Sequence, residues 1–157
     1  MSSTMIRVGL ISDTHGLLRP EALDFLRGCD HIVHAGDICD GAILQALSRL
    51  APITAVRGNN DHGHWARALR ETEMVALGGV LMYAIHDLAQ LDIAPRAAGV
   101  RVVVSGHSHR PLVAERDGVL FVNPGSAGPR RFTLPIAVGE LLIDDGAVSA
   151  RVDTIVR

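Results

Sequence analysis

Residues 5–16 read MIRVGLISDTHG, a mostly aliphatic run that ends abruptly in polar residues. The run from Met5 to Ile11 is short and apolar, which predicts a buried β-strand. Asp13 and His15 follow it, two positions apart. Side chains at positions i and i+2 of an extended segment project to the same side, so both groups can reach a single site. This stretch therefore predicts a strand that ends at a cluster of possible ligands.

The same organisation, a short apolar run followed by glycine and polar residues, recurs along the whole chain. The predicted strands are 5–11, 31–34, 53–56, 74–77, 80–85, 101–104, 112–115, 119–122, 136–143 and 147–156, and the predicted helices are 20–27, 41–50 and 88–98. Pro20 at a first turn and Asp40 as a cap favour the first two helices. The alternation predicts an α/β fold, with two sheets packed face to face and helices outside, in a single domain over residues 1–157.

Six of the apolar runs end in residues that can coordinate a cation: 12–15, 34–37, 57–62, 86–87, 105–109 and 123–126. The donors are carboxylate, imidazole and amide oxygen without thiolate, a set that suits Mn, Fe, Ni or Zn. Ligands in α/β folds bind beyond the carboxyl ends of strands, so we expect these segments to meet. The turns that aim their side chains inward are predicted to rely on Gly16, Gly36, Gly58 and Gly106.

Composition and charge exclude several classes of protein. Of 157 residues, 48% are hydrophobic and 20% charged, which suits a packed core and excludes global disorder. Aromatic residues make up only 3%, too few for a platform on which bases stack. The 15 basic residues are all arginine and are outnumbered by 17 acids, so the net charge of −2 gives no electrostatic argument for binding nucleic acid or membranes.

The sequence offers no membrane span or secretory signal, and the spacing of its cysteines also favours a cytoplasmic protein. No segment approaches the ~20 apolar residues of a membrane span, and the first apolar run is too short for a secretory signal. Cys29 and Cys39 form no CxxC motif, and both are predicted to be small buried hydrophobic residues. We therefore expect a reduced protein in the cytoplasm.

Taken in order, the polar segments contain these motifs: Asp13-Thr14-His15, Gly36-Asp37, Gly58-Asn59-Asn60-Asp61, His86, Gly106-His107-Ser108-His109 and Asn123-Pro124-Gly125-Ser126. The ordered set resembles the calcineurin-like metallophosphoesterase superfamily. It is most similar to the small bacterial and archaeal phosphodiesterases related to the retromer subunit Vps29. The resemblance runs from Asp13 to about Ile143. It implies a four-layer sandwich of two mixed β-sheets flanked by helices, and a site for two divalent metal ions. Mn2+ is the first expectation, with Ni2+, Fe2+ or Zn2+ as alternatives.

The resemblance also implies the role of each ligand. It assigns Asp13, His15 and His109 to the first ion, Asn59, His86 and His107 to the second, and Asp37 to a bridge between them. Asp37, Asn59 and His86 are expected to be catalytic as well. A water shared by two such ions is deprotonated near neutral pH, and the hydroxide would attack phosphorus in line. We therefore expect a metal-dependent phosphoesterase, foremost a phosphodiesterase, acting on a small phosphate ester.

Two positions depart from the family pattern. Asn60 stands where many members have a histidine that contacts the scissile phosphate, so a proton donor for the leaving group is missing there. His62 or His64 could replace it, or could be ordinary loop histidines. Asp87 stands where relatives usually have glycine. Its carboxylate either narrows the pocket and disfavours phosphate, or points to solvent or orients an imidazole.

Several further loop residues have more than one interpretation. Asp61 could hold a metal-bound histidine or cap the following segment, and His34 is expected to be structural. Residues 123–126 are expected to form a tight turn that supports the loop carrying His107. Arginines that could contact phosphate, or lie solvated at the surface, are Arg57, Arg130 and Arg131.

Two alternative functions remain on the same fold. One is a non-enzymatic protein-interaction scaffold, which the resemblance to the retromer subunit suggests. The other is a nucleic-acid exonuclease, which the short chain and the lack of a basic stripe disfavour. Association of the chain with itself is also an open expectation, through exposed aliphatic surface or an edge strand.

Overall fold

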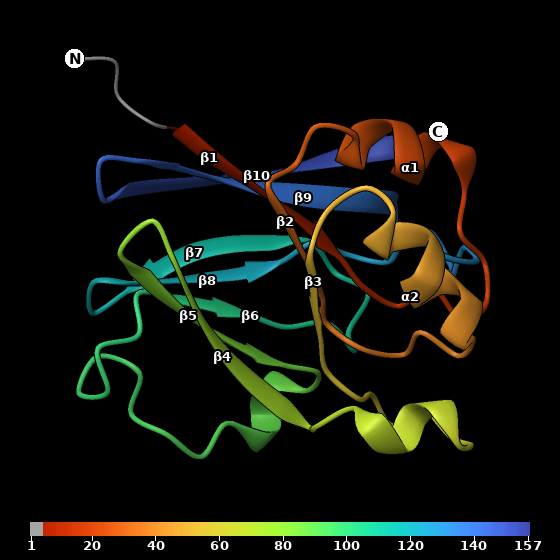
Figure 1. The fold of residues 1–157 in the computed structure, drawn as a ribbon, viewed down its shortest axis with the longest axis horizontal. Coiled ribbons are helices and arrows are strands. Elements are labelled where there is room, and N and C mark those ends of the chain that lie inside the picture. The colour runs from red at the N-terminus through yellow and green to blue at the C-terminus, as the bar shows by residue number, and fades with distance from the viewer. Residues whose placement is uncertain (1–4) are drawn as a thin grey trace.

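Two five-stranded β-sheets form the centre of the fold (Figure 1). The structure, a computed structural model, describes residues 5–157. The strands are β1 (Met5–Ile11), β2 (His31–His34), β3 (Ile53–Ala55), β4 (Thr72–Leu77), β5 (Val80–Ile85), β6 (Val102–Val104), β7 (Leu112–Arg116), β8 (Val119–Asn123), β9 (Ile136–Asp144) and β10 (Ala147–Val156). The helices are α1 (Pro20–Leu26) and α2 (Gly41–Ser48), with the short 3-10 helices η1 (Trp65–Ala68) and η2 (Leu88–Gln90).

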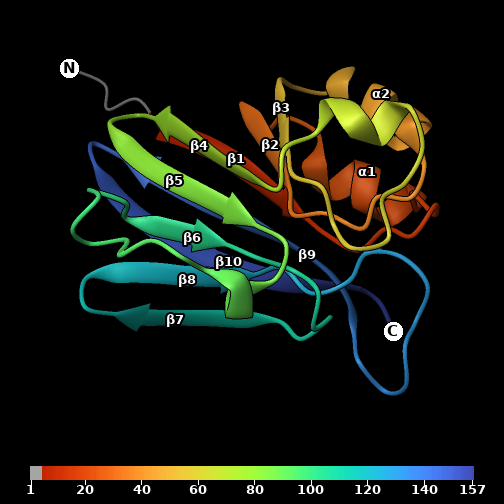
Figure 2. The ribbon, with the colours of Figure 1, turned by 90° about the horizontal axis from the view of Figure 1, so that it is seen from below.

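Both sheets are mixed: the parallel strands β1, β2 and β3 form one side of the first sheet, and the parallel strands β5, β6 and β8 form the centre of the second. The first has the order β10-β9-β1-β2-β3, and the second has the order β4-β5-β6-β8-β7. β1 pairs in parallel with β2, and β6 pairs in parallel with β5 and β8. In Figure 2, β6 and β8 lie in front of β9 and β10. Aliphatic side chains from both sheets fill the core between them, among them Val8, Leu10, Met82 and Val104. The predicted α/β sandwich is confirmed.

The two α-helices cover the other face of the first sheet. Successive residues of a strand point to opposite faces, so Ile11 lies outside the core that Leu10 enters. Ile11 belongs to a second apolar cluster, together with Leu26 of α1 and Leu47 of α2. Cys29 is buried in the same cluster, as predicted. The helices therefore form one outer layer of the sandwich.

The start signals of these helices act as predicted. Pro20 is the first residue of α1. Its fixed φ suits the first turn, and its lack of an N–H costs nothing there because a backbone N–H at this position has no hydrogen-bond acceptor within the helix. The side chain of Asp40 accepts a hydrogen bond from the backbone N–H of Ala42 at 3.0 Å and caps α2. Both helices end within two residues of the predicted ends at 27 and 50. Within residues 5–157, no helix has the length and apolar character needed to cross a membrane.

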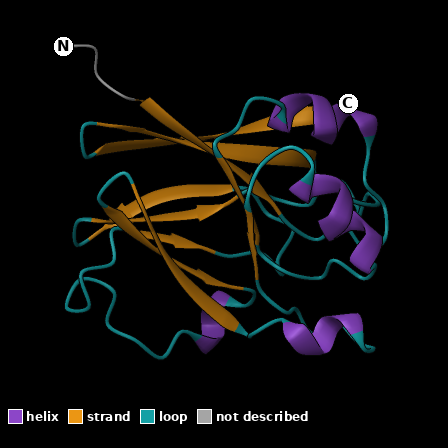
Figure 3. Cartoon of the chain, viewed as in Figure 1, coloured by secondary structure: helices purple, strands orange, loops and turns teal. Residues whose placement is uncertain are grey.

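The outer face of the second sheet is covered by irregular chain. The predicted helix over 88–98 is wrong, because only η2 forms there and turns and loop follow it (Figure 3). Pro95 lacks a backbone donor and disfavours helical backbone at the preceding residue. Leu91 and Ile93 still pack against the apolar cluster that contains Val103. The apolar residues thus cover the sheet without helical geometry. The other 3-10 helix, η1, was not predicted from the sequence.

Asp61 joins the loops that follow β2 and β3. Its side chain is buried, and its carboxylate accepts hydrogen bonds from backbone N–H groups of both loops. Oδ2 accepts from Asp37 at 3.0 Å and from Gly58 at 2.8 Å, and Oδ1 accepts from Ile38 and Cys39, both at 2.8 Å. Asp61 therefore has neither of the roles weighed from the sequence. It fixes the backbone around Asp37.

We expect Asp61→Asn to lower the free energy of unfolding by about 2–4 kcal/mol, because the amide NH2 group would face buried N–H donors that lose their acceptor. Urea unfolding of the chelator-treated protein measures this change. The matched control is Asp117→Asn at the exposed turn after β7, with an expected change within about 0.5 kcal/mol. Equal stability of the two variants would contradict the assignment.

Candidate metal centre

Loops at the carboxyl ends of strands from both sheets meet at one place. β1, β2 and β3 of the first sheet and β5, β6 and β8 of the second are each followed by one of the predicted polar segments. Parallel pairing within each group puts its loops at a common edge. Contacts between the groups, from Asp13 to His109 and from Asp37 to His86, show that the two edges face each other. The segments therefore converge as expected.

The backbone at this edge adopts a conformation that residues with side chains rarely use. Asp13, His15, Asp37, His107 and His109 all have left-handed φ values, between 45° and 70°. Such conformations cost roughly 1 kcal/mol or more for each residue and gather at functional sites. The surrounding structure therefore holds the five side chains in directions that ordinary turns would not give them.

Gly58 and Gly106 act differently from the prediction. Neither has a left-handed φ, whereas Gly36 does, at 102°. What these two positions require is space. A Cβ on Gly58 would overlap the carboxylate of Asp37, and one on Gly106 would overlap the hydroxyl of Ser12. The absent side chains allow the loops to approach closely enough for their ligands to meet.

Asp13, His15 and His109 form the first group of candidate ligands. Oδ1 of Asp13 lies 3.7 Å from Nε2 of His15 and 3.4 Å from Nε2 of His109. The other oxygen, Oδ2, accepts hydrogen bonds from the Ser12 hydroxyl at 2.7 Å and from the backbone N–H of His107 at 3.1 Å. These bonds fix the carboxylate so that Oδ1 faces the two imidazoles.

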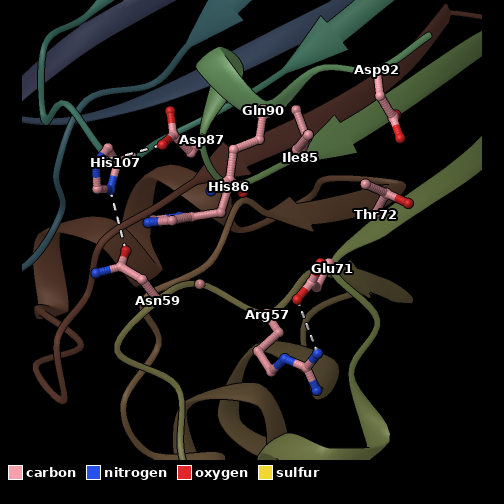
Figure 4. A pocket seen from close by; sticks show the side chains of 11 residues that line it. Arg57, Asn59, Glu71, Thr72, Ile85, His86, Asp87, Gln90, Asp92 and His107 are labelled. Carbon is pink, nitrogen blue, oxygen red and sulfur yellow. Dashed lines mark hydrogen bonds and ion pairs between the residues drawn. The ribbon is translucent and has the colours of Figure 1, made fainter.

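The second group contains Asp37, Asn59, His86 and His107. Nδ1 of His86 lies 2.7 Å from the carbonyl oxygen of Ala35 and donates to it, because a carbonyl can only accept. In the neutral ring, Nε2 then presents its lone pair to Oδ2 of Asp37, 3.3 Å away. Nδ1 of His107 lies 3.2 Å from Oδ1 of Asn59. Figure 4 shows Asn59, His86 and His107 gathered at one side of a hollow.

Asp37 connects the two groups. Its Oδ2 lies 3.3 Å from Nε2 of His86 and 3.7 Å from Nε2 of His15. Asn60 also binds this carboxylate, from its side-chain amide to Oδ2 at 2.9 Å and from its backbone N–H to Oδ1 at 2.8 Å. That role of Asn60 was not predicted, because it depends on how the loop after β3 folds back. All the predicted ligands therefore lie in one continuous cluster.

Three buried atoms at the centre of the cluster have no hydrogen-bond partner within the described residues: Oδ1 of Asp13, Nε2 of His15 and Nε2 of His86. Buried polar atoms are nearly always paired, because a missing partner costs free energy. Two overlapping groups of side chains could each hold an ion: Asp13 with His15 and His109, and Asp13 with Asp37 and His86. Within each group, one ligand atom from every residue lies within 4.8 Å of the others. Oxygen and imidazole donors at this spacing fit divalent metal ions.

The histidines of the cluster keep its carboxylates ionised. Burial alone would raise the pKa of Asp13, but the nearby imidazoles of His109 and His15 and the hydrogen bond from Ser12 hold this pKa well below the ordinary value. Burial would also raise the pKa of Asp37, yet the nearby imidazole of His86 and the hydrogen bonds from Asn60 lower it to about 2. Burial lowers the pKa of His86, and the carboxylate of Asp37 reverses this and raises it. Both aspartates are therefore charged at neutral pH, the form that binds metal.

Two buried residues support the ligand loops. Nδ1 of His34 accepts a hydrogen bond from the backbone N–H of Gly36 at 3.1 Å, and burial lowers the pKa of His34 to about 3. His34 is therefore neutral and structural, as predicted. The side-chain amide of Asn123 donates to the carbonyl oxygen of Gly106 at 3.0 Å. Asn123 thus supports the loop that carries His107, also as predicted.

Asp87 and Cys39 lie beside the ligands. Oδ1 of Asp87 accepts from the backbone N–H of Ala89 at 3.0 Å, and Oδ2 lies 3.9 Å from Nε2 of His107. Asp87 thus faces an imidazole of the cluster instead of solvent alone.

Cys39 is partly exposed, contrary to the prediction, and its Sγ lies 3.7 Å from Nδ1 of the His15 ring.

The remaining candidate side chains lie at the surface. The guanidinium of Arg57, a candidate phosphate contact in the sequence, lies 3.4 Å from the carboxylate of Glu71 and forms an ion pair with it at the surface. His62 and His64 are exposed in the loop before η1. Two further exposed residues are Arg130 and Arg131.

Two hollows border the cluster, and Asp87 and His107 line both of them. One, of about 330 Å3, is lined mainly by polar residues from the ends of β3, β4 and β5 and from the segment after η2. The other, of about 410 Å3, includes the apolar side chains of Leu88, Pro111 and Leu112. A ligand at the cluster can therefore extend in two directions.

Comparison with known proteins identifies the family. Residues 6–146 match the profile of the calcineurin-like phosphoesterase superfamily domain. A probable metallophosphoesterase of Methanothermobacter thermautotrophicus is 35% identical over 156 residues, which cover 92% of this chain and 90% of that protein. A phosphodiesterase of Methanocaldococcus jannaschii is 27% identical over 138 residues, or 76% of this chain and 83% of that one.

The fold comparison agrees with the sequence comparison. The structure of Vacuolar Protein Sorting 29 from Cryptosporidium parvum matches with a TM-score of 0.77 at 18% identity, covering 95% of this chain and 97% of that chain. At this identity the match shows a shared fold. The family profile spans most of the chain and ends in the turn after β9, so it covers the second sheet, the polar segments and every strand of the first sheet except β10. The chain belongs to the calcineurin-like phosphoesterase superfamily.

Proposed function

We propose that the protein is a metal-dependent phosphodiesterase with two divalent ions at the cluster. The observation that carries the proposal is the convergence of buried, unpartnered lone pairs on Asp13, His15 and His86 around the carboxylate of Asp37. The proposed ligands are Asp13, His15 and His109 for one ion, Asn59, His86 and His107 for the other, and Asp37 for both. Imidazole and oxygen donors favour Mn2+, with Ni2+, Fe2+ or Zn2+ as alternatives.

The residues of the cluster suit attack of water on a phosphate ester. When bound, divalent cations neutralise phosphate charge and lower the pKa of water at the site. Asp13 and Asp37 are the only ligands with negative charge, so the site stays positive and attracts an anionic phosphate. In the reaction, the water oxygen bonds to phosphorus, the opposite P–O ester bond breaks, and the leaving alkoxide takes up a proton. Asn60 holds Asp37 in place through both carboxylate oxygens.

A diester is favoured over a monoester for two reasons. A diester carries two alcohol arms, and two hollows meet at Asp87 and His107. A monoester carries a second negative charge close to the carboxylate of Asp87, which would repel it. One relative is named a phosphodiesterase, in agreement with this choice.

Both cysteines are free thiols, which suits the reducing cytoplasm as the location.

We expect chelation of metal to abolish turnover of bis-p-nitrophenyl phosphate, and added Mn2+ to restore it. Asp37→Asn should lower kcat/KM by more than about a hundredfold, since losing a residue that merely supports a ligand already costs 10–100-fold. The control is Asp117→Asn, which lies far from the cluster. Metal bound at full occupancy without hydrolysis of any phosphate ester would instead favour the protein-interaction scaffold.

Metal affinity should fall as pH falls. Asp37 raises the pKa of His86 above its ordinary value of 6.5. Below that raised pKa, the imidazole of His86 carries a proton in the metal-free protein, and a metal ion must displace this proton to bind. Each displaced proton lowers the apparent affinity by about tenfold per pH unit below that pKa. Calorimetric titration with Mn2+ at about pH 6 and about pH 8 measures the difference. Equal affinities would exclude His86 as a ligand.

Turnover should depend strongly on the leaving group. Apart from the proposed ligands, no histidine of the described chain lines either hollow, so no imidazole is free to protonate the leaving oxygen. We expect His62→Ala and His64→Ala to leave kcat unchanged for a diester with an alkyl leaving group. A loss of about a hundredfold or more in either variant would identify that histidine as the general acid.

A further inference from the structure

The polar hollow beside the second group of ligands contains an excess of negative charge. Its charged side chains are three carboxylates, Glu71, Asp87 and Asp92, and one guanidinium, Arg57. Arg57 lies 3.4 Å from Glu71, so these two charges offset each other. Asp87 and Asp92 remain without a cationic partner at ion-pair distance in the described chain, apart from the imidazole of His107 that Asp87 approaches at 3.9 Å.

The charges are separated across the hollow. Figure 4 shows Asp92, Thr72 and Glu71 on the side opposite Asn59 and His107. His86 lines the same hollow, is 5% exposed, and carries the unpartnered Nε2 that marks the metal cluster. The proposed cations therefore lie at one end of the hollow. The carboxylates of Asp92 and Glu71, called here the acidic wall, lie at the other end.

We propose that this hollow selects phosphodiesters in which one alcohol arm carries a positive charge. The inference rests on the proposed function, because it needs the phosphate anion to sit at the metal cluster. From there, one arm reaches toward Asp92, whose carboxylate has no cationic partner in the described chain, so a cation is attracted there and an anion is repelled. An arm that carries another phosphate, as in a nucleic-acid strand, is disfavoured by the same wall.

The second hollow accommodates the other arm. Its lining includes Leu88, Pro111 and Leu112, so it suits an apolar group. Asp87 and His107 border both hollows and divide them. A substrate with a cationic arm and an apolar arm thus matches the two surfaces on either side of the cluster.

The test compares two substrates that differ by one charge. The first is p-nitrophenyl phosphorylcholine, and the second is its uncharged isostere, in which carbon replaces the ammonium nitrogen. Both release p-nitrophenol, so their chemistry is matched. At low salt we expect kcat/KM for the choline ester to exceed that of the isostere by about tenfold, the size of effect a nearby charge produces in a partly solvated pocket. The ratio should shrink toward unity in about 0.5 M salt, which screens charges beyond a few ångströms.

The variants separate the acidic wall from the overall charge of the protein. Asp92→Asn and the double variant Glu71→Gln/Asp92→Asn should lower the ratio of the two kcat/KM values toward unity. The control Glu115→Gln/Asp117→Asn removes the same charge at exposed positions of β7 and the turn after it, and should preserve the ratio.

The outcomes are distinct. A ratio near unity in the unaltered protein, or one that the double variant does not change, overturns this inference while the hydrolase assignment stands. The salt dependence of the ratio tests the same point without any substitution. Absence of turnover of either substrate, and of bis-p-nitrophenyl phosphate, overturns the proposed function itself.

Discussion

Buried lone pairs that face one another at the meeting edge of two sheets are the constraint on which the rest of the structure depends. Asp13, His15 and His86 present unpartnered atoms there, and Asp37 connects them. Like charges and unpaired acceptors repel, so a cation or a proton between them stabilises such an arrangement, and a rigid frame must hold it together. The left-handed backbone of the candidate ligand residues and the close approach of Gly58 and Gly106 are parts of that frame.

The frame follows from the topology of the sheets. Parallel strands end at the same edge, and each sheet contributes such strands to the site. The aliphatic core between the sheets brings these two edges together. Asp61 then joins neighbouring loops by accepting hydrogen bonds from backbone N–H groups that would otherwise be buried without partners. Stability and function thus share the same residues, since the strained loops persist only because the core and Asp61 hold them.

Side chains that are not among the proposed ligands surround the cluster. Asn60 binds the carboxylate that connects the two groups of ligands, and Asp87 stands between a polar hollow and an apolar one. Side chains at such positions leave the ligand set unchanged but alter the charge and shape of the space around the phosphate. Differences in substrate choice between relatives of one fold are expected to arise there, because affinity differences depend on the few groups that touch the variable part of a ligand.

The sequence by itself determined the strands, the first two helices and the convergence of the ligand segments, because hydrophobic periodicity and the order of parallel strands are local or topological properties. It failed at residues 88–98, where apolar spacing resembled a helix and Pro95 prevented one. Tertiary structure alone decided the roles of Asp61 and Asn60, the pairing of Arg57 with Glu71, and the two hollows. Each depends on distances between segments far apart in the chain, and periodicity carries no information about such distances.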